Sequence, residues 1–210
     1  MTRIFIVDDH SLFRAGVRQI LAKQSDLRVV GEAGNGAEAV AGIKEHDCDV
    51  VLLDLTMPGM GGLEILGDIK RERPHARVLV LSMHPEDQYA TRILKAGAAG
   101  YLTKESAAEE LIAAIRKVAG GGIYVSAHLA EKLASALHSP AEVLPHQTLS
   151  EREFQVLTQL VRGKKLKEIA QSLFLSEKTI TTYRSRILEK LNLHNNAELI
   201  HYAIQNKLIS

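Results

Sequence analysis

Five polar residues of the sequence directly follow or end short apolar runs: Asp8, Asp9, Asp54, Ser82 and Lys104. Such runs are typical of strands in a parallel sheet, and ligands bind beyond the carboxyl ends of those strands. Three carboxylates gathered there repel one another unless a cation is present, and Mg²⁺ with oxygen ligands is the expected one. A carboxylate nucleophile beside a divalent metal and a lysine suits phosphoryl transfer.

Asp54 is the best candidate for the nucleophile, because it directly ends the apolar run 50–53 and leads into a turn-rich loop at 55–62. Each polar residue alone has an ordinary structural explanation. An Asp-Asp pair is common near a helix N-cap, a serine is often a turn or helix cap, and a lysine is usually a solvated charge. Their joint placement at successive strand ends is what indicates a site.

Five strand-then-helix repeats in the first 120 residues would position these side chains. The apolar runs lie at 4–7, 29–31, 50–53, 78–81 and 100–102, and helical patterns lie between them near 11–23, 36–45, 61–72, 86–96 and 106–119. Parallel strands need crossover helices, so the repeats predict a doubly wound α/β domain with a five-stranded parallel sheet. We predict that this domain spans residues 1–119.

Composition divides the chain into two parts. Its 210 residues suit two compact units. Residues 1–148 carry 16 Lys and Arg against 19 Asp and Glu, whereas residues 149–210 carry 10 against 6, which favours a polyanionic partner for the second part. The single cysteine, Cys48, excludes an intramolecular disulfide. No segment approaches the ~20 apolar residues of a membrane span, and no signal peptide precedes the first strand, so we expect a cytoplasmic protein without a membrane partner.

The remaining sequence predicts a linker and a small all-α unit. The glycines 120–122 break the fifth helix, and we interpret residues 120–145 as a linker carrying one helix near 128–138. Ser150 and Glu153 form a capping-box pattern, after which four short helices follow to about residue 206. The third of these, to Leu191, buries Ile180 and Ile187 and leaves cations and hydroxyls outward. Residues 146–210 are therefore either a helix-turn-helix reader of DNA or a helical protein-interaction module with a solvated basic face.

The first 118 residues resemble the receiver domain of two-component response regulators. The matching motifs are Val7-Asp-Asp-His10, Leu53-Asp-Leu-Thr-Met-Pro-Gly59, Leu81-Ser82 and Ala96-Gly-Ala-Ala-Gly-Tyr-Leu-Thr-Lys104. The resemblance implies a flavodoxin-like sheet of order 2-1-3-4-5, with Asp54 as phosphoacceptor. It implies a Mg²⁺ site formed by Asp8, Asp9, Asp54 and the Thr56 backbone carbonyl. It also implies that Ser82 and Lys104 bind the phosphoryl group and that Tyr101 is the switch aromatic.

Residues 146–208 resemble the LuxR-type helix-turn-helix, on the motifs Leu149-Ser-Glu-Arg-Glu153, Lys167-Glu-Ile-Ala170, Leu175-Ser-Glu-Lys-Thr-Ile180 and Leu188-Glu-Lys-Leu191. A receiver followed by this domain resembles the NarL/FixJ subfamily of bacterial regulators. The resemblance implies a recognition helix at about 177–191. It implies base contacts from Thr181, Thr182 and Ser185, and phosphate contacts from Lys178, Thr179, Tyr183, Arg184 and Arg186.

The combined resemblance implies a phosphorylation-dependent transcription regulator. A sensor histidine kinase would phosphorylate Asp54, and the protein would then bind specific duplex DNA as a homodimer. It would not be an enzyme beyond self-phosphorylation and self-dephosphorylation. Three alternatives remain: an aspartyl-phosphate hydrolase, a docking protein that ignores DNA, and a receiver-type regulator that works without phosphorylation. Such hydrolases carry a second Asp two residues after the nucleophile, where this chain has Thr56.

Overall fold

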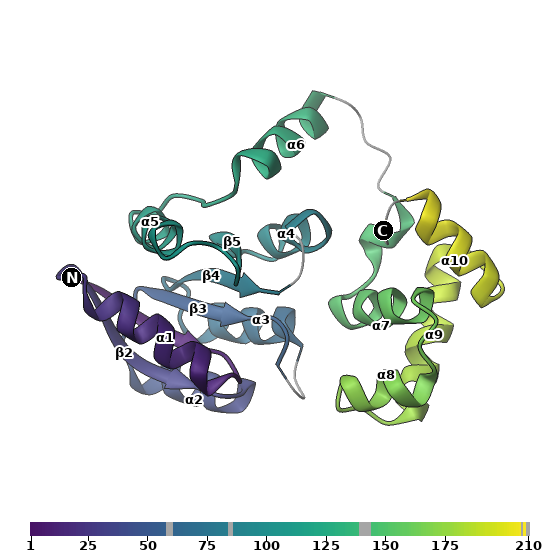
Figure 1. Ribbon diagram of the computed structural model, residues 1–210, viewed down its shortest axis with the longest axis horizontal. Coiled ribbons are helices and arrows are strands. Elements are labelled where there is room, and N and C mark those ends of the chain that lie inside the picture. The colour runs from purple at the N-terminus through teal and green to yellow at the C-terminus, as the bar shows by residue number, and fades with distance from the viewer. Residues whose placement is uncertain (58–60, 84–85, 139–143, 207, 209–210) are drawn as a thin grey trace. The chain divides into compact units, whose positions relative to one another are not determined.

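The computed structural model describes residues 1–57, 61–83, 86–138, 144–206 and 208, and it divides into two compact units, Met1–His138 and Ser139–Ser210. Figure 1 shows the elements of both units. The strands are β1 (Thr2–Val7), β2 (Leu27–Ala33), β3 (Val50–Asp54), β4 (Arg77–Ser82) and β5 (Gly100–Thr103). The helices of the first unit are α1 (Ser11–Ala22), α2 (Gly36–Glu45), α3 (Gly62–Glu72), α4 (Glu86–Lys95), α5 (Ala108–Ala119) and α6 (Ala127–His138).

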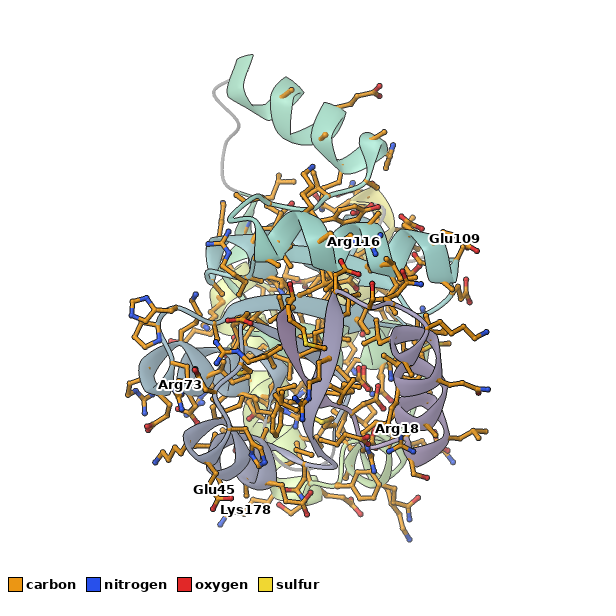
Figure 2. All side chains as sticks on the ribbon, turned by 90° about the vertical axis from the view of Figure 1, so that its left-hand side faces the viewer. Arg18, Glu45, Arg73, Glu109, Arg116 and Lys178 are labelled. Carbon is orange, nitrogen blue, oxygen red and sulfur yellow. The ribbon has the colours of Figure 1, made fainter. Side chains whose placement is uncertain are left out.

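The first unit contains the predicted five-stranded sheet, with the order β2-β1-β3-β4-β5 and only parallel pairs. All five residues of the central strand β3 are buried. One face of the sheet packs on α1 and α5 through alternate residues such as Ile4, Leu52 and Leu79. Charged side chains on these two helices, such as Arg18 of α1 and Arg116 of α5, point outward (Figure 2). The predicted order 2-1-3-4-5 and the doubly wound fold class are confirmed.

The segment after α5 continues along the edge of this sheet. Tyr124 forms an isolated parallel bridge with Gly100 of β5, and its amide donates to the carbonyl of Ala99 at 2.8 Å. A side chain at Gly100 would place its Cβ only 2.7 Å from the Tyr124 carbonyl oxygen, so this close approach requires glycine. Leu129 of α6 is 1% exposed. The boundary of the first unit at His138 thus falls inside the 120–145 region that the sequence predicted as a linker.

The second unit is all-helical. It contains a short 3-10 helix, η1 (Pro145–Thr148), followed by α7 (Glu151–Val161), α8 (Leu166–Ser172), α9 (Glu177–Leu191) and α10 (Asn196–Gln205). The predicted capping box at the start of α7 is present, with the Glu153 carboxylate accepting from the Ser150 amide at 2.7 Å. The same carboxylate contacts Lys190 Nζ of α9 at 2.7 Å, which ties the two helices together. The four predicted helices are confirmed.

In the described part of the chain, no helix combines the length and the apolar character that a membrane span requires.

Candidate functional site

Strand ends bring Asp8, Asp54 and Lys104 into one pocket at the carboxyl edge of the sheet. The Lys104 ammonium lies 2.7 Å from Asp8 Oδ2 and 2.7 Å from Asp54 Oδ2. The side chains of these three residues are only 2%, 1% and 6% exposed, in the order Asp8, Asp54, Lys104. One cation therefore bridges two buried carboxylates, one directly after β1 and one at the end of β3.

Burial controls the protonation of this pocket. It raises the pKa of Asp54, and the neighbouring Asp8 charge raises it further, whereas hydrogen bonds from Lys104 and the Thr56 amide lower it. For Lys104, burial lowers the pKa, but the hydrogen bonds to Asp54 and Asp8 outweigh burial and leave the pKa raised. Lys104 is therefore held as an ammonium ion, whereas burial makes the ionised form of Asp54 less favourable than it is in water.

The pocket also brings together side chains that could bind a metal ion. Ligand atoms of Asp8, Asp9, His10 and Asp54 all lie within 4.8 Å of one another. His10 Nδ1 is 2.9 Å from Asp9 Oδ1 and 3.3 Å from Asp8 Oδ1. A set of carboxylate oxygens fits a hard cation such as Mg²⁺, which prefers oxygen to nitrogen. The Thr56 amide donates to Asp54 Oδ1 at 3.0 Å, so the backbone after β3 folds back beside the same group.

Ser82 and Tyr101 form a second, buried pair next to the carboxylates. Their exposed fractions are 0% and 1%, and they come from the neighbouring strands β4 and β5. Burial raises the pKa of Tyr101, and a hydrogen bond with Ser82 acts in the opposite direction. The Lys104 amide donates to the Ser82 carbonyl at 2.9 Å. Ser82, predicted to bind the phosphoryl group, is therefore bonded both to Tyr101, the predicted switch aromatic, and to the main chain of Lys104.

Helix α9 presents a polar face in the second unit. Five of the eight residues predicted to contact DNA have exposed side chains: Lys178, Thr181, Thr182, Ser185 and Arg186. Thr179, Tyr183 and Arg184 are half-buried. A shallow groove of about 340 Å³ is lined by Ser176, Lys178, Thr179, Thr182, Tyr183 and Arg186. The groove is open and has two cations and several hydroxyls on its walls, which suits a phosphate-bearing ligand.

Two regions of the chain match models of known protein families. Residues 4–116 match the response regulator receiver domain, and residues 147–203 match the luxR family of bacterial regulatory proteins. This chain is a response regulator. The order of its two domains places it in the NarL/FixJ subfamily, as the motifs predicted.

Named relatives match the response regulator over its full length. It is 41% identical to response regulator UvrY of Escherichia coli (strain K12) over 209 residues, which cover 99% of this chain and 96% of UvrY. It is 40% identical to response regulator GacA of Pseudomonas aeruginosa over 210 residues, or 100% and 98% of the two chains. A solved structure of the Salmonella typhimurium RcsB response regulator matches with a TM-score of 0.70 at 28% identity over 96% of both chains. An RcsB–DNA complex matches with a TM-score of 0.60 at 26% identity and the same coverage.

Two polar contacts of this response regulator were not predicted from the sequence. His10 lies against Asp8 and Asp9, and the only signal for it was its place directly after the Asp-Asp pair. Arg184 was expected to face phosphate, yet its Nε donates to Asn196 Oδ1 at the start of α10, at 2.7 Å. Contacts between neighbouring helices depend on packing angles, which the spacing of residues along one helix does not encode.

Proposed function

We propose that this response regulator is a phosphorylation-dependent bacterial transcription regulator. In this proposal residues 1–119 are the receiver, residues 120–145 are the linker, and residues 146–210 bind DNA. A sensor histidine kinase phosphorylates Asp54, and the phosphorylated protein binds specific duplex DNA as a homodimer in the cytoplasm. The observation that carries the proposal is the Lys104 ammonium 2.7 Å from the carboxylates of both Asp54 and Asp8.

The transfer itself needs one nucleophile and charge neutralisation. A carboxylate oxygen of Asp54 attacks the phosphorus of the partner's phosphohistidine. The P–N bond breaks, the imidazole nitrogen keeps its electron pair, and an acyl phosphate forms. Asp8, Asp9, Asp54 and the Thr56 carbonyl would hold Mg²⁺, which neutralises charge on the phosphoryl oxygens when it is bound. Lys104 supplies a fixed positive charge to the same group, because its raised pKa keeps it protonated.

A conformational change caused by phosphorylation would reach the segment after α5 through two hydrogen bonds between Glu86 and Ser126. Glu86 begins α4, soon after Ser82 in the sequence, and its carboxylate accepts hydrogen bonds from both the amide and the hydroxyl of Ser126. Ser126 in turn caps α6, since its hydroxyl oxygen accepts from the Leu129 amide at 3.1 Å. Movement of the β4–α4 connection towards a phosphoryl group would therefore pull on the first turn of α6.

DNA binding is assigned to α9. Its exposed cations Lys178 and Arg186 would contact phosphates together with Thr179, Tyr183 and Arg184, while Thr181, Thr182 and Ser185 face base edges. In the described part of the chain neither Lys178 nor Arg186 forms an ion pair, so their charges are available to a polyanion. The proposal is supported by the luxR-family match and by the RcsB–DNA complex among the similar structures.

The homodimer part of the proposal is supported by α10. Ile200 and Ile204 lie one helical turn apart on α10 and are 37% and 59% exposed. Two large apolar side chains on one exposed turn are a modest patch that a second copy would cover. A dimer would present two recognition helices to adjacent half-sites.

Intact mass spectrometry tests the phosphoacceptor directly. Incubation with Mg²⁺ and a small phosphodonor should add one phosphoryl group to the wild type and none to Asp54→Asn. Asp68→Asn on α3 is a matched control that should be phosphorylated like the wild type. Full phosphorylation of Asp54→Asn would refute the assignment. A mobility shift with duplex DNA then separates a regulator, which binds after phosphorylation, from a docking protein, which never binds.

A further inference from the structure

The hydroxyl groups on the exposed face of α9 are already engaged with their own helix. Thr181 Oγ1 donates to the carbonyl of Glu177 at 2.9 Å, and Thr182 Oγ1 donates to the carbonyl of Lys178 at 3.0 Å. Ser185 Oγ donates to the carbonyl of Thr181 at 3.2 Å. All three bonds run from residue i to residue i−4, and all three side chains are exposed. A ligand on this face therefore meets hydroxyl groups whose hydrogen atoms are already donated to main-chain carbonyls of α9.

A hydroxyl has a single hydrogen to donate and two lone pairs that accept. With that hydrogen directed to a main-chain carbonyl, Thr181 and Thr182 each offer a ligand an acceptor oxygen and a methyl group. Ser185 offers the acceptor oxygen alone. On the outward side of α9 the fully exposed cations are Lys178 and Arg186, whereas Arg184 is half-buried and directs its Nε to Asn196.

The base pairs differ in what they present to such a face. In the major groove adenine presents an amino donor at N6 and thymine presents its C5 methyl group, whereas guanine presents two acceptors, O6 and N7, and cytosine presents an amino donor at N4 without a methyl group. An acceptor oxygen complements the amino group of adenine or of cytosine, but only the A·T pair adds a thymine methyl group on which a threonine methyl can pack. Guanine needs donors, and neither threonine offers a free one.

We infer that Thr181 and Thr182 read A·T base pairs, accepting from the adenine N6 amino group and packing their methyl groups on the thymine C5 methyl. This inference rests on the proposed DNA binding by α9. Lys178 and Arg186 line the groove beside Thr182 and hold the phosphates, which leaves the threonines as the specificity-determining residues.

Base analogues test this reading without changing the protein. Duplexes that bind the full-length, phosphorylated protein are first selected from a random library. Thymine is then replaced by uracil, which lacks the C5 methyl, and adenine by purine, which lacks the N6 amino group. At the pairs read by the threonines, uracil should weaken wild-type binding about fourfold, the factor for one buried methyl group. Purine should also weaken binding at the same pairs.

Two matched substitutions separate the two contacts. Thr181→Ser and Thr182→Ser keep the hydroxyl but lose the methyl, so each should bind the uracil and thymine duplexes equally at its own position. Thr181→Val and Thr182→Val keep a methyl but lose the acceptor, so each should become insensitive to purine while it keeps the preference for thymine. Thermal unfolding should be nearly unchanged in all four variants, because both side chains are exposed.

The failures of the inference and of the proposed function are distinguishable. Selection of sites specified only by G·C pairs, or wild-type binding that tolerates uracil and purine at every position, overturns the threonine reading and leaves DNA binding intact. Absence of binding to any duplex after confirmed phosphorylation of Asp54 overturns the proposed function, and the inference with it.

Discussion

The main-chain amide of Tyr101 donates a hydrogen bond of 3.3 Å to the carbonyl oxygen of Tyr124. Tyr101 has its ring buried beside Ser82, whereas Tyr124 lies in the segment that leads from α5 to α6. The Tyr124 hydroxyl donates to the Glu110 carboxylate of α5 at 3.0 Å, which fixes the segment a second time. The main chain of Tyr101 is therefore bonded directly to the segment between α5 and α6.

Weakening the contact between Glu86 of α4 and Ser126, which precedes α6, should mimic activation. Ser126→Ala removes a hydroxyl bonded to the Glu86 carboxylate, and a hydrogen bond to a charged group contributes about 1.5–3 kcal/mol. We expect faster amide hydrogen exchange in α6 and tighter DNA binding by the unphosphorylated protein, with Glu86→Gln acting in the same direction. Ser25→Ala, at an exposed site, is the control. Unchanged exchange in α6 would remove Ser126 from the proposed route.

Ser82 and Lys104 should report phosphorylation rather than accept it. Ser82→Ala should still gain one phosphoryl group at Asp54, because the nucleophile and the carboxylates stay in place. Its DNA affinity should no longer rise on phosphorylation, since the bond between Ser82 and Tyr101 is lost. Lys104→Ala should be uncoupled in the same way. Parallel measurement of intact mass and DNA binding checks both, and normal activation of either variant would contradict the switch.

Asp54 should make stability depend on pH when Mg²⁺ is absent. Burial raises the pKa of Asp54 above its ordinary 3.8, so the folded state holds this proton more tightly than the unfolded state does. The contribution of the protonated Asp54 carboxyl to the free energy of unfolding is therefore fully present below pH 3.8 and is lost as the pH rises through the folded-state pKa.

Asp54→Asn does not titrate at this position, so in a chelator its stability relative to the wild type should increase as the pH rises from 3.8 through the folded-state pKa of Asp54. Urea unfolding at a series of pH values measures the difference. Added Mg²⁺ should shrink it, because the cation stabilises the carboxylate form. A difference that is constant across this range would show that Asp54 is not the destabilised group.

The sequence predicted the sheet and the pocket well because both follow from local rules. Buried parallel strands are continuously apolar, so the residue that ends each run, such as Asp54 after β3, marks the carboxyl edge of the sheet. The path of residues 120–138 was not predictable in this way. Tyr124 pairs with β5 through main-chain groups, and the clue was the glycine at position 100, whose meaning depends on a neighbour distant in sequence.

The face of α9 was predicted in the same partial manner. Helical spacing identified Ile180 and Ile187 as buried and Thr181, Thr182 and Ser185 as outward, and the structure agrees for these residues. The spacing did not reveal that the three hydroxyls donate to their own helix, because the rotamer of each side chain determines whether its hydroxyl bonds to the main chain or to solvent.

Phe174 should be a position where a substitution stabilises the fold. It ends α8 in a left-handed conformation, with φ of +55°, and its amide and that of Leu175 donate to the carbonyls of Gln171 and Ala170. Gly97, Gly163 and Asn192 hold the same left-handed position after α4, α7 and α9. Glycine and asparagine adopt this conformation readily, but phenylalanine does not, and the Phe174 side chain is 70% exposed.

Phe174→Gly should therefore stabilise the second unit by about 1 kcal/mol, because it relieves backbone strain and sacrifices little buried area. Hydrogen exchange of the α8 and α9 amides in the full-length chain measures this local stability. Asn192→Gly is the matched comparison and should change it much less. If hydrogen exchange were not slower in Phe174→Gly than in the wild type, Phe174 would have to make stabilising contacts that outweigh the backbone strain.

Lys178 and Arg186 should supply affinity for DNA without supplying specificity. Both side chains are exposed, and both line the groove on α9. Each phosphate contact releases condensed counterions, so the logarithm of the binding constant falls with the logarithm of the salt concentration. Lys178→Ala and Arg186→Ala should each reduce that slope by about one and weaken a selected duplex and a scrambled duplex by similar factors.

A salt titration of each variant on the two duplexes is the measurement. Lys23→Ala is the control for charge, since it removes one exposed cation from the first unit and should leave the slope unchanged. Thr181→Val should behave in the opposite way, with an unchanged slope and an altered preference between the two duplexes. If Lys178→Ala and Arg186→Ala kept the wild-type slope, α9 would not lie against the phosphate backbone, and the assignment of α9 as the recognition helix would have to be abandoned.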